Sequence, residues 1–416
     1  MPGRWPRKMD YTGDSAAGDV VVVMAISWGH RVARSGRREL LVLAAPLRGL
    51  HDVVNDLYVK HGSVFMAGLF GPNVTFLIGP EVTAHFFQGL ESEISHGKMF
   101  VFAVHMFGNA VGLGRDIATQ NEQRRFNSEA LKMSRMRSHV SPMLDEVELP
   151  IPSNRRRDRA RIRLTKILSD VIESRKISGR VEEDTLQKLI DSKYKDGSST
   201  TVEEVAGMAM AMLFVGKHSS SITSTWTGAR LLSHPTFLKA AIEEQIQIAK
   251  KYKDGLDNNA FMEMETLHNC IKEVLRMHPP MGVLVRKAHK KFTVQTKEGK
   301  TYEIPQGQIV ATPTVVSNHI PYIYKDPQVY DPDRFGPERQ EDKVGGKFSY
   351  TSFSGGRHVC TGEAFAYLQI KVIWSHLLRN FEFELISPFP KTDWSKFLAE
   401  PKGNLFVRYK RTSFPQ

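Results

Sequence analysis

Residues 353–362 read FSGGRHVCTG, and this stretch decides how the rest of the chain is interpreted. Glycine permits positive-φ turns and lets the backbone come close to a flat ligand. A pattern typical of a helix follows Cys360 to about Arg379, and a helix N-terminus favours the thiolate over the thiol. The stretch therefore predicts a glycine-rich loop that presents Cys360 to a bound group, in preference to a buried structural cysteine.

The residues around Cys360 support the same interpretation. Arg357 and His358 can donate hydrogen bonds to carboxylates on the same ligand, and Gly362 keeps the start of the helix close to whatever Cys360 touches. Cys270 is the second of only two cysteines. Two cysteines cannot form a Cys-rich zinc site or a disulfide framework. A single disulfide stays open, but two reduced thiols in a cytosol-facing protein fit the sequence better.

Composition and net charge limit the classes of protein to which this chain can belong. The 416 residues are 41% hydrophobic and 25% charged, as in soluble globular proteins, and the net charge is +12. Such a charge suits an acidic partner, an anionic membrane surface or nucleic acid. The densest basic run, residues 155–163, contains no aromatic residue and leads into apolar residues at helical spacing. We interpret it as a solvated helix face and expect no nucleic-acid partner.

Hydrophobic patterning predicts a mainly α fold with a small β region. Residues 1–50 are expected to be poorly ordered, and residues 51–416 to form one domain. The apolar runs 20–28 and 40–50 are too short or too interrupted for a membrane anchor or a signal peptide. Strands are expected at 64–70 and 74–78 around a Gly-Pro-Asn turn, and in 292–311 around a turn at 298–299. Helices are expected at 121–133 and 264–277.

The longest helical pattern begins at Thr201, where the sequence TVEE has the form of a capping box. The pattern continues to Leu232 and stops before Pro235. Residues 216–221, GKHSSS, interrupt an otherwise apolar helix with glycine and polar side chains. This block indicates either a kink or an exposed patch in a helix that crosses the whole domain.

A charged pair lies within the shorter helix expected at 264–277. Glu273 and Arg276 stand at i and i+3, so they share a helix face and can pair. The later sequence PDRF adds Arg334.

Together these segments resemble the cytochrome P450 superfamily. The stretch 353–362 matches its heme-binding signature, F-x-x-G-x-x-x-C-x-G, at every fixed position. Glu273 and Arg276 match its Glu-x-x-Arg motif, and Arg334 the partner arginine. Residues 222–229 (ITSTWTGA), 194–197, 330–337 and 377–382 look specifically like plant sterol 14α-demethylases, the obtusifoliol 14α-demethylase family. The resemblance extends from about residue 51 to the C-terminus, and its details are similar to those of a diverged grass paralogue.

The resemblance implies an enzyme that inserts one oxygen atom from O2 into a sterol or triterpene. It implies one heme b (iron protoporphyrin IX) with Cys360 as the iron ligand, and electrons from NADPH delivered by a membrane-bound reductase. It implies the cytosolic face of the endoplasmic reticulum membrane as the location, although no anchor is seen. Glu273, Arg276 and Arg334 would lock the core behind the heme loop.

The resemblance also implies roles for individual residues. His218 and Ser219 stand where the family holds an acid–alcohol pair that relays protons. Residues matching heme-contacting positions are Arg125, Arg286, Phe353, Gly356, Arg357, His358 and Gly362. Candidate substrate-pocket residues are Phe100, Phe102, Met106, Met208, Ala211, Val215 and Leu284. Any of these pocket residues, Met208 and Leu284 above all, is equally consistent with ordinary core packing.

Several features depart from the family. Val215 replaces a usual Ala or Gly, Ser219 a usual Thr, Phe100 a usual Tyr, and His105 a usual Pro. Residue 148 also runs directly into Leu149, where the family has several distal helices, including one that roofs the substrate pocket. Roughly 60 to 70 residues are missing there, beyond ordinary loop variation. A rival hypothesis follows: a heme-binding but catalytically impaired remnant, or an interaction protein.

Overall fold

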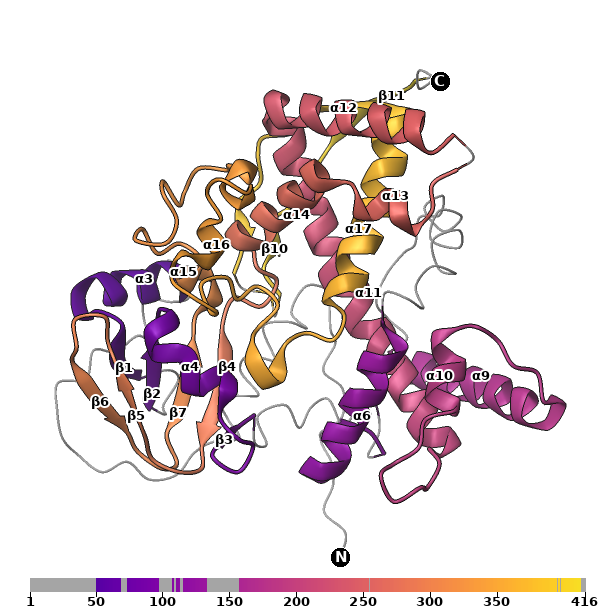
Figure 1. Cartoon of the computed structure of the whole chain (residues 1–416), viewed down its shortest axis with the longest axis horizontal. Coiled ribbons are helices and arrows are strands. Elements are labelled where there is room, and N and C mark those ends of the chain that lie inside the picture. Colours follow the sequence, from indigo (N-terminus) through magenta and orange to yellow (C-terminus); the bar gives the residue numbers. More distant parts are fainter. Residues whose placement is uncertain are drawn as a thin grey trace, which may run out of the picture.

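A computed structural model describes residues 50–68, 73–96, 107, 110–112, 115–132, 157–253, 255–394, 396 and 398–412. Helices dominate these residues (Figure 1). The strands β1 to β7 lie together on one side of the molecule, whereas β11 lies at the opposite end, near the C-terminus. The mainly α fold with a small β region is therefore confirmed. The predicted poorly ordered segment 1–50 lies almost wholly outside the described residues, as do Phe100, Phe102, His105, Met106 and the junction at 148–149.

The largest sheet has the strand order β1-β2-β7-β4-β3. The predicted hairpin is confirmed, because Val64 of β1 pairs with Leu77 of β2 in an antiparallel register. The strands are β1 (Val64–Gly68), β2 (Asn73–Leu77), β3 (Ile94–Ser95), β4 (Leu284–Ala288) and β7 (Ile309–Thr312). Val74, Phe76 and Ala311 are buried, so the pairing of β2 with β7 covers an apolar face.

The predicted two-strand region at 292–311 contains three strands. β5 (Phe292–Gln295) and β6 (Thr301–Ile304) form the expected hairpin, with Gly299 at a φ of +81° in its turn. β7 follows a second turn at Gly307 and joins the larger sheet instead, because Val310 and Ala311 are buried there. The remaining strands pair as β8 (Phe381–Leu385) with β11 (Val407–Arg411) and β9 (Thr392–Asp393) with β10 (Glu400–Pro401).

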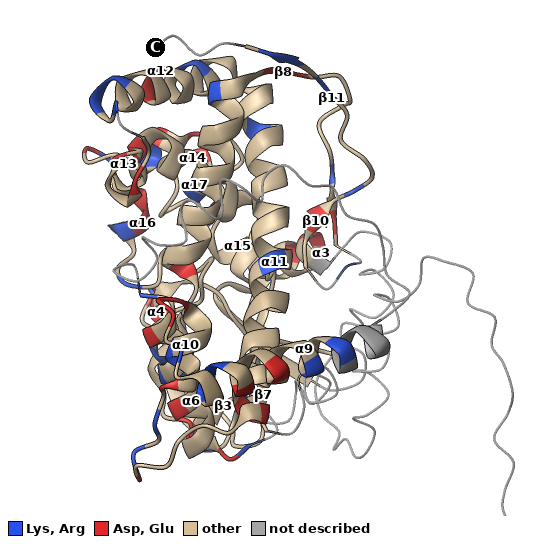
Figure 2. Ribbon diagram, turned by 90° about the vertical axis from the view of Figure 1, so that its right-hand side faces the viewer, with Lys and Arg blue, Asp and Glu red and all other residues tan. Residues whose placement is uncertain are grey.

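The long helix α11 (Val202–Ser233) runs through the molecule, and Figure 2 shows it reaching from α12 to the level of α9 and α6. Its 32 residues span about 48 Å at 1.5 Å per residue. The predicted capping box is present: the Thr201 hydroxyl accepts from the Glu204 amide at 3.2 Å, and the Glu204 carboxylate accepts from the Thr201 amide at 2.9 Å. The helix continues without a break through Gly216, so the polar block is an exposed patch.

The other helices surround α11. Those near its C-terminal half are α12 (Pro235–Lys251), α13 (Asn258–Met262), α14 (Glu265–Met277) and α17 (Glu363–Asn380). Those near its N-terminal half are α6 (Ile117–Ala130), α9 (Arg157–Ser178) and α10 (Thr185–Ile190). The β region carries α3 (Leu50–His61), α4 (Pro80–Gln88) and α15 (Thr314–Ser317). Shorter elements are the 3-10 helices η3 (Pro332–Phe335) and η4 (Gly356–His358), and α16 (Glu341–Val344).

The largest hydrophobic core lies between α12, α14 and α17. Cys270 on α14 belongs to it, and burial raises the pKa of its thiol to about 12. Both cysteines are free thiols in the structure. Cys270 is therefore a core residue with no role at the surface.

Candidate functional site

The loop before α17 has the shape that its glycines predict. Gly356 has a φ of +59°, and a Cβ atom there would lie 2.2 Å from the carbonyl oxygen of Phe87 on α4. The amide of Cys360 donates to the carbonyl of Phe353 at 2.9 Å, which folds the loop back on itself. Cys360 is exposed and stands three residues before Glu363, the first residue of α17. The loop thus presents one thiol at the N-terminal end of a helix.

The charge state of Cys360 differs from the sequence expectation. Desolvation by the surrounding protein raises the pKa of the thiol, and the carboxylate of Glu363 adds to the rise. The backbone hydrogen bond from Gly362 acts in the opposite direction but does not outweigh burial. The protein itself therefore holds the pKa of the Cys360 thiol above its ordinary value, and coordination to a metal ion would remove the proton.

A cluster of basic side chains lies beside this loop. Arg286 on β4 is buried and donates to the ring of His96 at 2.7 Å and to the carbonyl of Phe86 at 3.1 Å. The rings of His96 and His358 meet edge to face with their centres 5.1 Å apart. Burial lowers the pKa of Arg286 to about 10 and, together with Arg286, lowers the pKa of His96 to about 3. The cluster holds cationic charge in a poorly solvated place.

Two further residues complete the cluster. Arg124 on α6 donates to His358 Nδ1 at 2.9 Å and to the carbonyl oxygen of Arg357 at 3.0 Å. The carboxylate of Glu91 lies 2.9 Å from His358 Nε2. Arg357 itself donates to the carbonyl of Gln88 at 2.9 Å. The sequence analysis missed both Arg124 and His96, because nothing in their local sequence marks them; only the fold brings them to the loop.

Arg125 forms no hydrogen bond or ion pair with the described residues of this cluster, although it lines the same hollow as Arg124 and Arg357, so its predicted contact with the cofactor stays a prediction. Its guanidinium donates to the carbonyl of Lys193 at 2.9 Å and lies 3.7 Å from Glu122. The side chain is 51% exposed. The reason is helical geometry, since consecutive residues of a helix point about 100° apart and Arg124 already faces the loop.

The predicted relay residues lie in the middle of α11. The hydroxyl of Ser219 donates to the carbonyl of Val215 at 2.9 Å, and His218 is exposed. The pattern repeats along the helix: Ser220, Ser221, Thr223, Thr225 and Thr227 each bond to the carbonyl four residues earlier. A Cβ atom built at Gly216 would meet no atom within 4 Å, so there is open space beside this part of α11.

The predicted pocket residues fall into two groups. Met208 is 2% exposed and packs against Val111 and Val205, which is ordinary core packing. Leu284 is half-buried against the core of the β region, and Ala211 is also half-buried. Val215, in contrast, is 58% exposed. The structure therefore leaves only part of the predicted face of α11 available to a ligand.

The centre of α11 is less covered by the described residues than the parts of the helix on either side of it. None of the nine consecutive residues 211–219 is buried, whereas both flanking parts of the helix contain buried residues. Nine residues make more than two turns, so they point in all directions. Leu213 is 60% and Phe214 49% exposed, although large apolar side chains in a central helix are normally covered. One side faces the open space at Gly216, and on another side the ring of Phe214 meets the ring of Phe107 edge to face, with the ring centres 5.6 Å apart.

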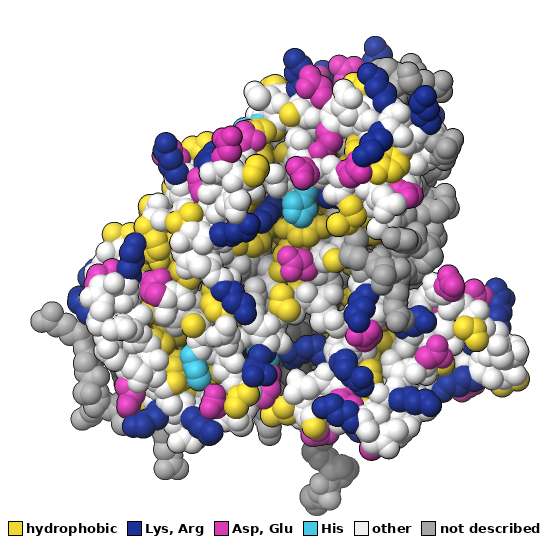
Figure 3. Space-filling view, in the orientation of Figure 1, with side chains coloured by type: hydrophobic (Ala, Val, Ile, Leu, Met, Phe, Trp, Pro, Cys, Tyr) yellow, Lys and Arg dark blue, Asp and Glu magenta, His cyan; other side chains and the backbone are white. Residues whose placement is uncertain are grey.

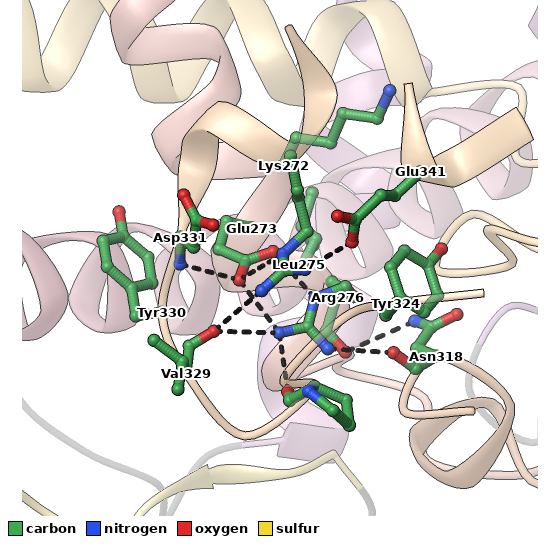
Figure 4. A network of polar contacts seen from close by, with 12 residues as sticks. Lys272, Glu273, Leu275, Arg276, Asn318, Tyr324, Val329, Tyr330, Asp331 and Glu341 are labelled. Atoms are coloured by element: carbon green, nitrogen blue, oxygen red, sulfur yellow. Dashed lines mark hydrogen bonds and ion pairs between the residues drawn. The ribbon is translucent and has the colours of Figure 1, made fainter. Parts of the chain in front are cut away.

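The predicted charged motif forms a buried network (Figure 4). The Arg276 guanidinium donates twice to the Glu273 carboxylate, at 2.7 and 2.9 Å, and Arg334 donates to the same carboxylate at 3.0 Å. All three side chains are fully buried. Arg276 also donates to the carbonyls of Asn318 and Pro327, so the network ties α14 to the loops that precede and follow Tyr324.

Two hollows flank the Cys360 loop. The larger has a volume of about 980 Å³ and is lined by Cys360, Glu363 and His268, among others. The smaller, about 720 Å³, is lined by Arg124, Arg125 and Arg357. Figure 3 shows one face of the molecule, on which Lys and Arg side chains gather in the lower half around a hollow. The face that carries the loop is therefore positively charged.

The residues around the Cys360 loop fit heme. Heme presents an iron ion and two carboxylates on a flat ring, and the loop offers one thiol, glycines without side chains and a cationic cluster. The cluster contains Arg286, Arg124 and Arg357, with Glu91 as the carboxylate in contact with it. The two carboxylates of heme would pair with the positive charges that Glu91 leaves unpaired, because a buried charge is stable only when it is paired.

Comparison with known proteins agrees with this geometry. The family model for Cytochrome P450 matches residues 106–407. The retinoic acid bound cyanobacterial CYP120A1 has a similar structure, with a TM-score of 0.75 over 88% of this chain and 96% of that chain, at 20% sequence identity. At this identity the likeness shows the fold alone.

Two curated relatives show to which group within this family the chain is most similar. The obtusifoliol 14-alpha demethylase of Sorghum bicolor is 45% identical over 428 positions, which cover 88% of this chain and 87% of that protein. The sterol 14-demethylase of Arabidopsis thaliana is 44% identical, with coverage of 88% for each chain. Because 88% of 416 residues is about 366, about 62 of the 428 aligned positions have no residue of this chain opposite them. The chain belongs to the cytochrome P450 family and, within it, to the group of plant sterol 14-demethylases.

Proposed function

We propose that this chain is a heme-thiolate monooxygenase that inserts one oxygen atom from O2 into a sterol or triterpene. The observation that carries the proposal is the loop that presents Cys360 beside a cationic cluster built on the buried Arg286, in a chain 45% identical to an obtusifoliol demethylase. Heme, when bound, supplies the redox chemistry, which a thiolate ligand biases toward cleavage of the O–O bond. The side chains of this protein bind and orient the cofactor and supply protons.

Cys360 supplies the thiolate, and the loop holds it. The bond from the Cys360 amide to the carbonyl of Phe353 fixes the distance between the two ends of the loop. Gly356 and Gly362 keep side chains away from the space that the ligand would occupy. Arg286 is proposed to hold the carboxylates of the cofactor, because it presents N–H donors beside the loop. The two ring nitrogens of His358 already meet Arg124 and the carboxylate of Glu91, so His358 contributes by holding these two residues beside the loop.

His218 and Ser219 are proposed to supply protons. The Ser219 hydroxyl gives its hydrogen to the carbonyl of Val215, so its oxygen presents lone pairs to the open space. A water molecule there would donate to Ser219 and exchange protons with the exposed imidazole of His218. Ser219 lacks the methyl group that fixes the rotamer of threonine, so its hydroxyl turns more freely.

The electron donor is proposed to be an NADPH-dependent reductase with an acidic docking face. The positively charged face around the loop, with Arg124, Arg125 and Arg357 lining its smaller hollow, suits such a partner. The proposed location is the cytosolic surface of the endoplasmic reticulum membrane, on family resemblance. Among the described residues, no helix is both long and apolar enough to cross a bilayer.

A second candidate is a chain that binds heme but turns over sterols poorly. The exposed apolar side chains at the centre of α11 favour it, since Leu213, Phe214 and Val215 are only partly covered by the described residues. The alignment positions without a residue in this chain support a gap, which we propose to lie between residues 148 and 149. A roof absent at this point would admit water to the site.

Two measurements test the proposal. The reduced, carbon monoxide-bound absorption spectrum of the purified chain should show the shifted Soret band of a thiolate-ligated heme. Oxygenated sterol formed per NADPH consumed, with a plant reductase present, then separates an efficient enzyme from an impaired one. A chain that binds no heme would refute both candidates.

A further inference from the structure

The larger hollow beside the Cys360 loop is separate from the cationic cluster that fits heme. Most of its walls come from α13, α14, α16 and α17, together with residues 359–361 of the loop. Among the described residues, those of the cluster (Arg286, His96 and His358) do not line it, and neither does any residue of α11. Its volume of about 980 Å³ is sufficient for a drug-sized ligand. The hollow is therefore available to a ligand other than the one that the cluster binds.

One face of α17 forms a wall of this hollow. The α17 residues that line it recur at helical spacing: Glu363, Ala364, Tyr367, Leu368 and Lys371. Lys371 is only 5% exposed, and its ammonium group donates to the carbonyl oxygen of Phe261 at 2.8 Å. This is the one hydrogen bond that the described residues form with it, whereas an ammonium group has three N–H donors. Two donors of a buried cation are therefore left for a ligand.

Lys371 forms no ion pair with the described residues. Two carboxylates, those of Glu244 on α12 and Glu265 on α14, attract it through space. The Glu244 carboxylate is already engaged, because it accepts the backbone amides of Thr266 and Leu267 at 2.6 and 3.1 Å. Burial outweighs this attraction and lowers the pKa of Lys371 to about 8. Because a buried charge is stable only when it is paired, an anion beside Lys371 would stabilise its charged form.

The remaining charges around the hollow are mostly positive. Lys343 and Lys347 line it and are exposed, so they would attract an anion from solution. Lys272 and Asp342 also line it, but they pair with each other at 2.8 Å and so cancel. The carboxyl group of Glu363 is the other acidic group in the lining. The hollow therefore favours anions over cations.

The uncharged part of the lining is aromatic. Phe261, Tyr350 and Tyr367 line the hollow, and the ring centre of His268 lies 4.3 Å from that of Tyr367. His268 is neutral, because burial and the charge of Lys371 lower its pKa to about 3. These rings offer flat apolar surface to the body of a ligand whose charged end reaches Lys371.

We propose that the larger hollow is a second ligand site, which takes a small amphipathic anion. A carboxylate, phosphate or sulfonate group would pair with Lys371, and an aromatic or aliphatic body would pack against Phe261, Tyr350 and Tyr367. A neutral or cationic ligand would leave Lys371 unpaired. The site does not depend on what the Cys360 loop binds.

The test uses the full chain loaded with heme, which fills the cationic cluster, and two probes: anilinonaphthalene sulfonate and its uncharged analogue phenylnaphthylamine. Equilibrium dialysis should show tighter binding of the sulfonate than of the analogue. Lys371→Met keeps the length of the side chain but removes its charge. It should bind the sulfonate about tenfold more weakly, as expected for loss of one hydrogen bond to a charged group, and the analogue equally well.

The matched control is Lys239→Met, which removes a lysine of α12 that is 79% exposed and lies outside the hollow. It should change the binding of neither probe. The comparison between the two variants also holds for a chain without heme, because Lys371 lies outside the cationic cluster.

Proton uptake gives a second readout. With a pKa of about 8, Lys371 is partly deprotonated at pH 8, and a bound anion favours its charged form. Binding of the sulfonate at pH 8 should therefore take up a fraction of a proton, which calorimetry in buffers of different ionisation enthalpy measures. The uptake should vanish at pH 6, where Lys371 is already charged, and in Lys371→Met.

Several results would overturn the assignment. Equal affinity for the sulfonate and the analogue, or unchanged sulfonate binding in Lys371→Met, would remove Lys371 from any anion site. If Lys371→Met does not fold, acetylation of the unaltered chain by acetic anhydride decides, followed by mass spectrometry. The sulfonate should slow acetylation at Lys371 and not at Lys239; equal acetylation of Lys371 with and without the sulfonate would place the probe elsewhere.

Discussion

The Arg276 guanidinium and the Glu273 carboxylate form two hydrogen bonds, 2.7 and 2.9 Å long, at a place where neither side chain has exposed surface. Removing one partner leaves the other as an unpaired buried charge, which typically costs about 3–5 kcal/mol. Arg276→Ala should therefore unfold at a much lower urea concentration and purify without heme. Lys291→Ala is the matched control, because it breaks an ion pair of 3.2 Å to Glu303 in which both side chains are more than half exposed. A stable, heme-loaded Arg276→Ala protein would contradict the structural role.

Cys360→Ala should abolish the thiolate-type carbon monoxide spectrum and all oxygenation. The reason is that Cys270, the other cysteine, is fully buried in the core between α12, α14 and α17 and cannot replace it. The control is Cys270→Ala, which should keep the spectrum and lose only some stability. A shifted Soret band retained in Cys360→Ala would disprove the assignment of the ligand.

A third expectation concerns the gap between residues 148 and 149. With the centre of α11 only partly covered by the described residues, water reaches the site, and reducing equivalents should be consumed with little sterol product. Sterol binding also loses apolar contact at about 25 cal/mol per Å² no longer buried. Inserting the corresponding segment of the Sorghum relative should raise the product formed per NADPH. Tight coupling in the unaltered chain would mean that another part of it closes the pocket.

Acid should destabilise the protein through its buried histidines. Burial, and then Arg276, lowers the pKa of His319 to about 3, and burial also lowers the pKa of His278. Both rings are neutral when folded but take up protons when unfolded, so their contribution is complete above about pH 6.5 and is lost as the pH falls toward 3. Each such group changes the unfolding free energy by at most about 1.4 kcal/mol per pH unit.

The variant His319→Asn checks this assignment. Its amide can still donate to the carbonyl of Val315, which the histidine ring contacts at 2.7 Å, but it does not titrate. Urea midpoints measured between pH 7 and pH 4 should fall less steeply than in the unaltered chain. An unchanged slope would show that His319 does not contribute.

The features that the sequence predicted correctly are local ones. The Cys360 loop, the capping box at Thr201 and the pair Glu273–Arg276 each involve residues within a few positions, so spacing alone places them together. The cationic cluster is different, because Arg286 meets His96 across 190 positions and Arg124 meets His358 across 234. No local pattern marks such partners. The prediction that Arg125 contacts the cofactor stays a prediction. The rotation of α6, which sets the direction of that side chain, depends on Gln123, whose partners lie 11, 13 and 71 positions away.

The partly covered centre of α11 has a consequence for its backbone. Helices usually exchange their amide hydrogens fastest at the ends, where the hydrogen-bond ladder frays. In α11 both ends are packed, with Val205 and Leu231 fully buried, whereas none of residues 211–219 is buried. Its exchange profile should therefore be inverted, with slow amides toward each end and a fast window around residues 213–219. A ligand seated against Gly216 would slow that window and leave the ends unchanged, so deuterium uptake there reports occupancy of the site without any turnover.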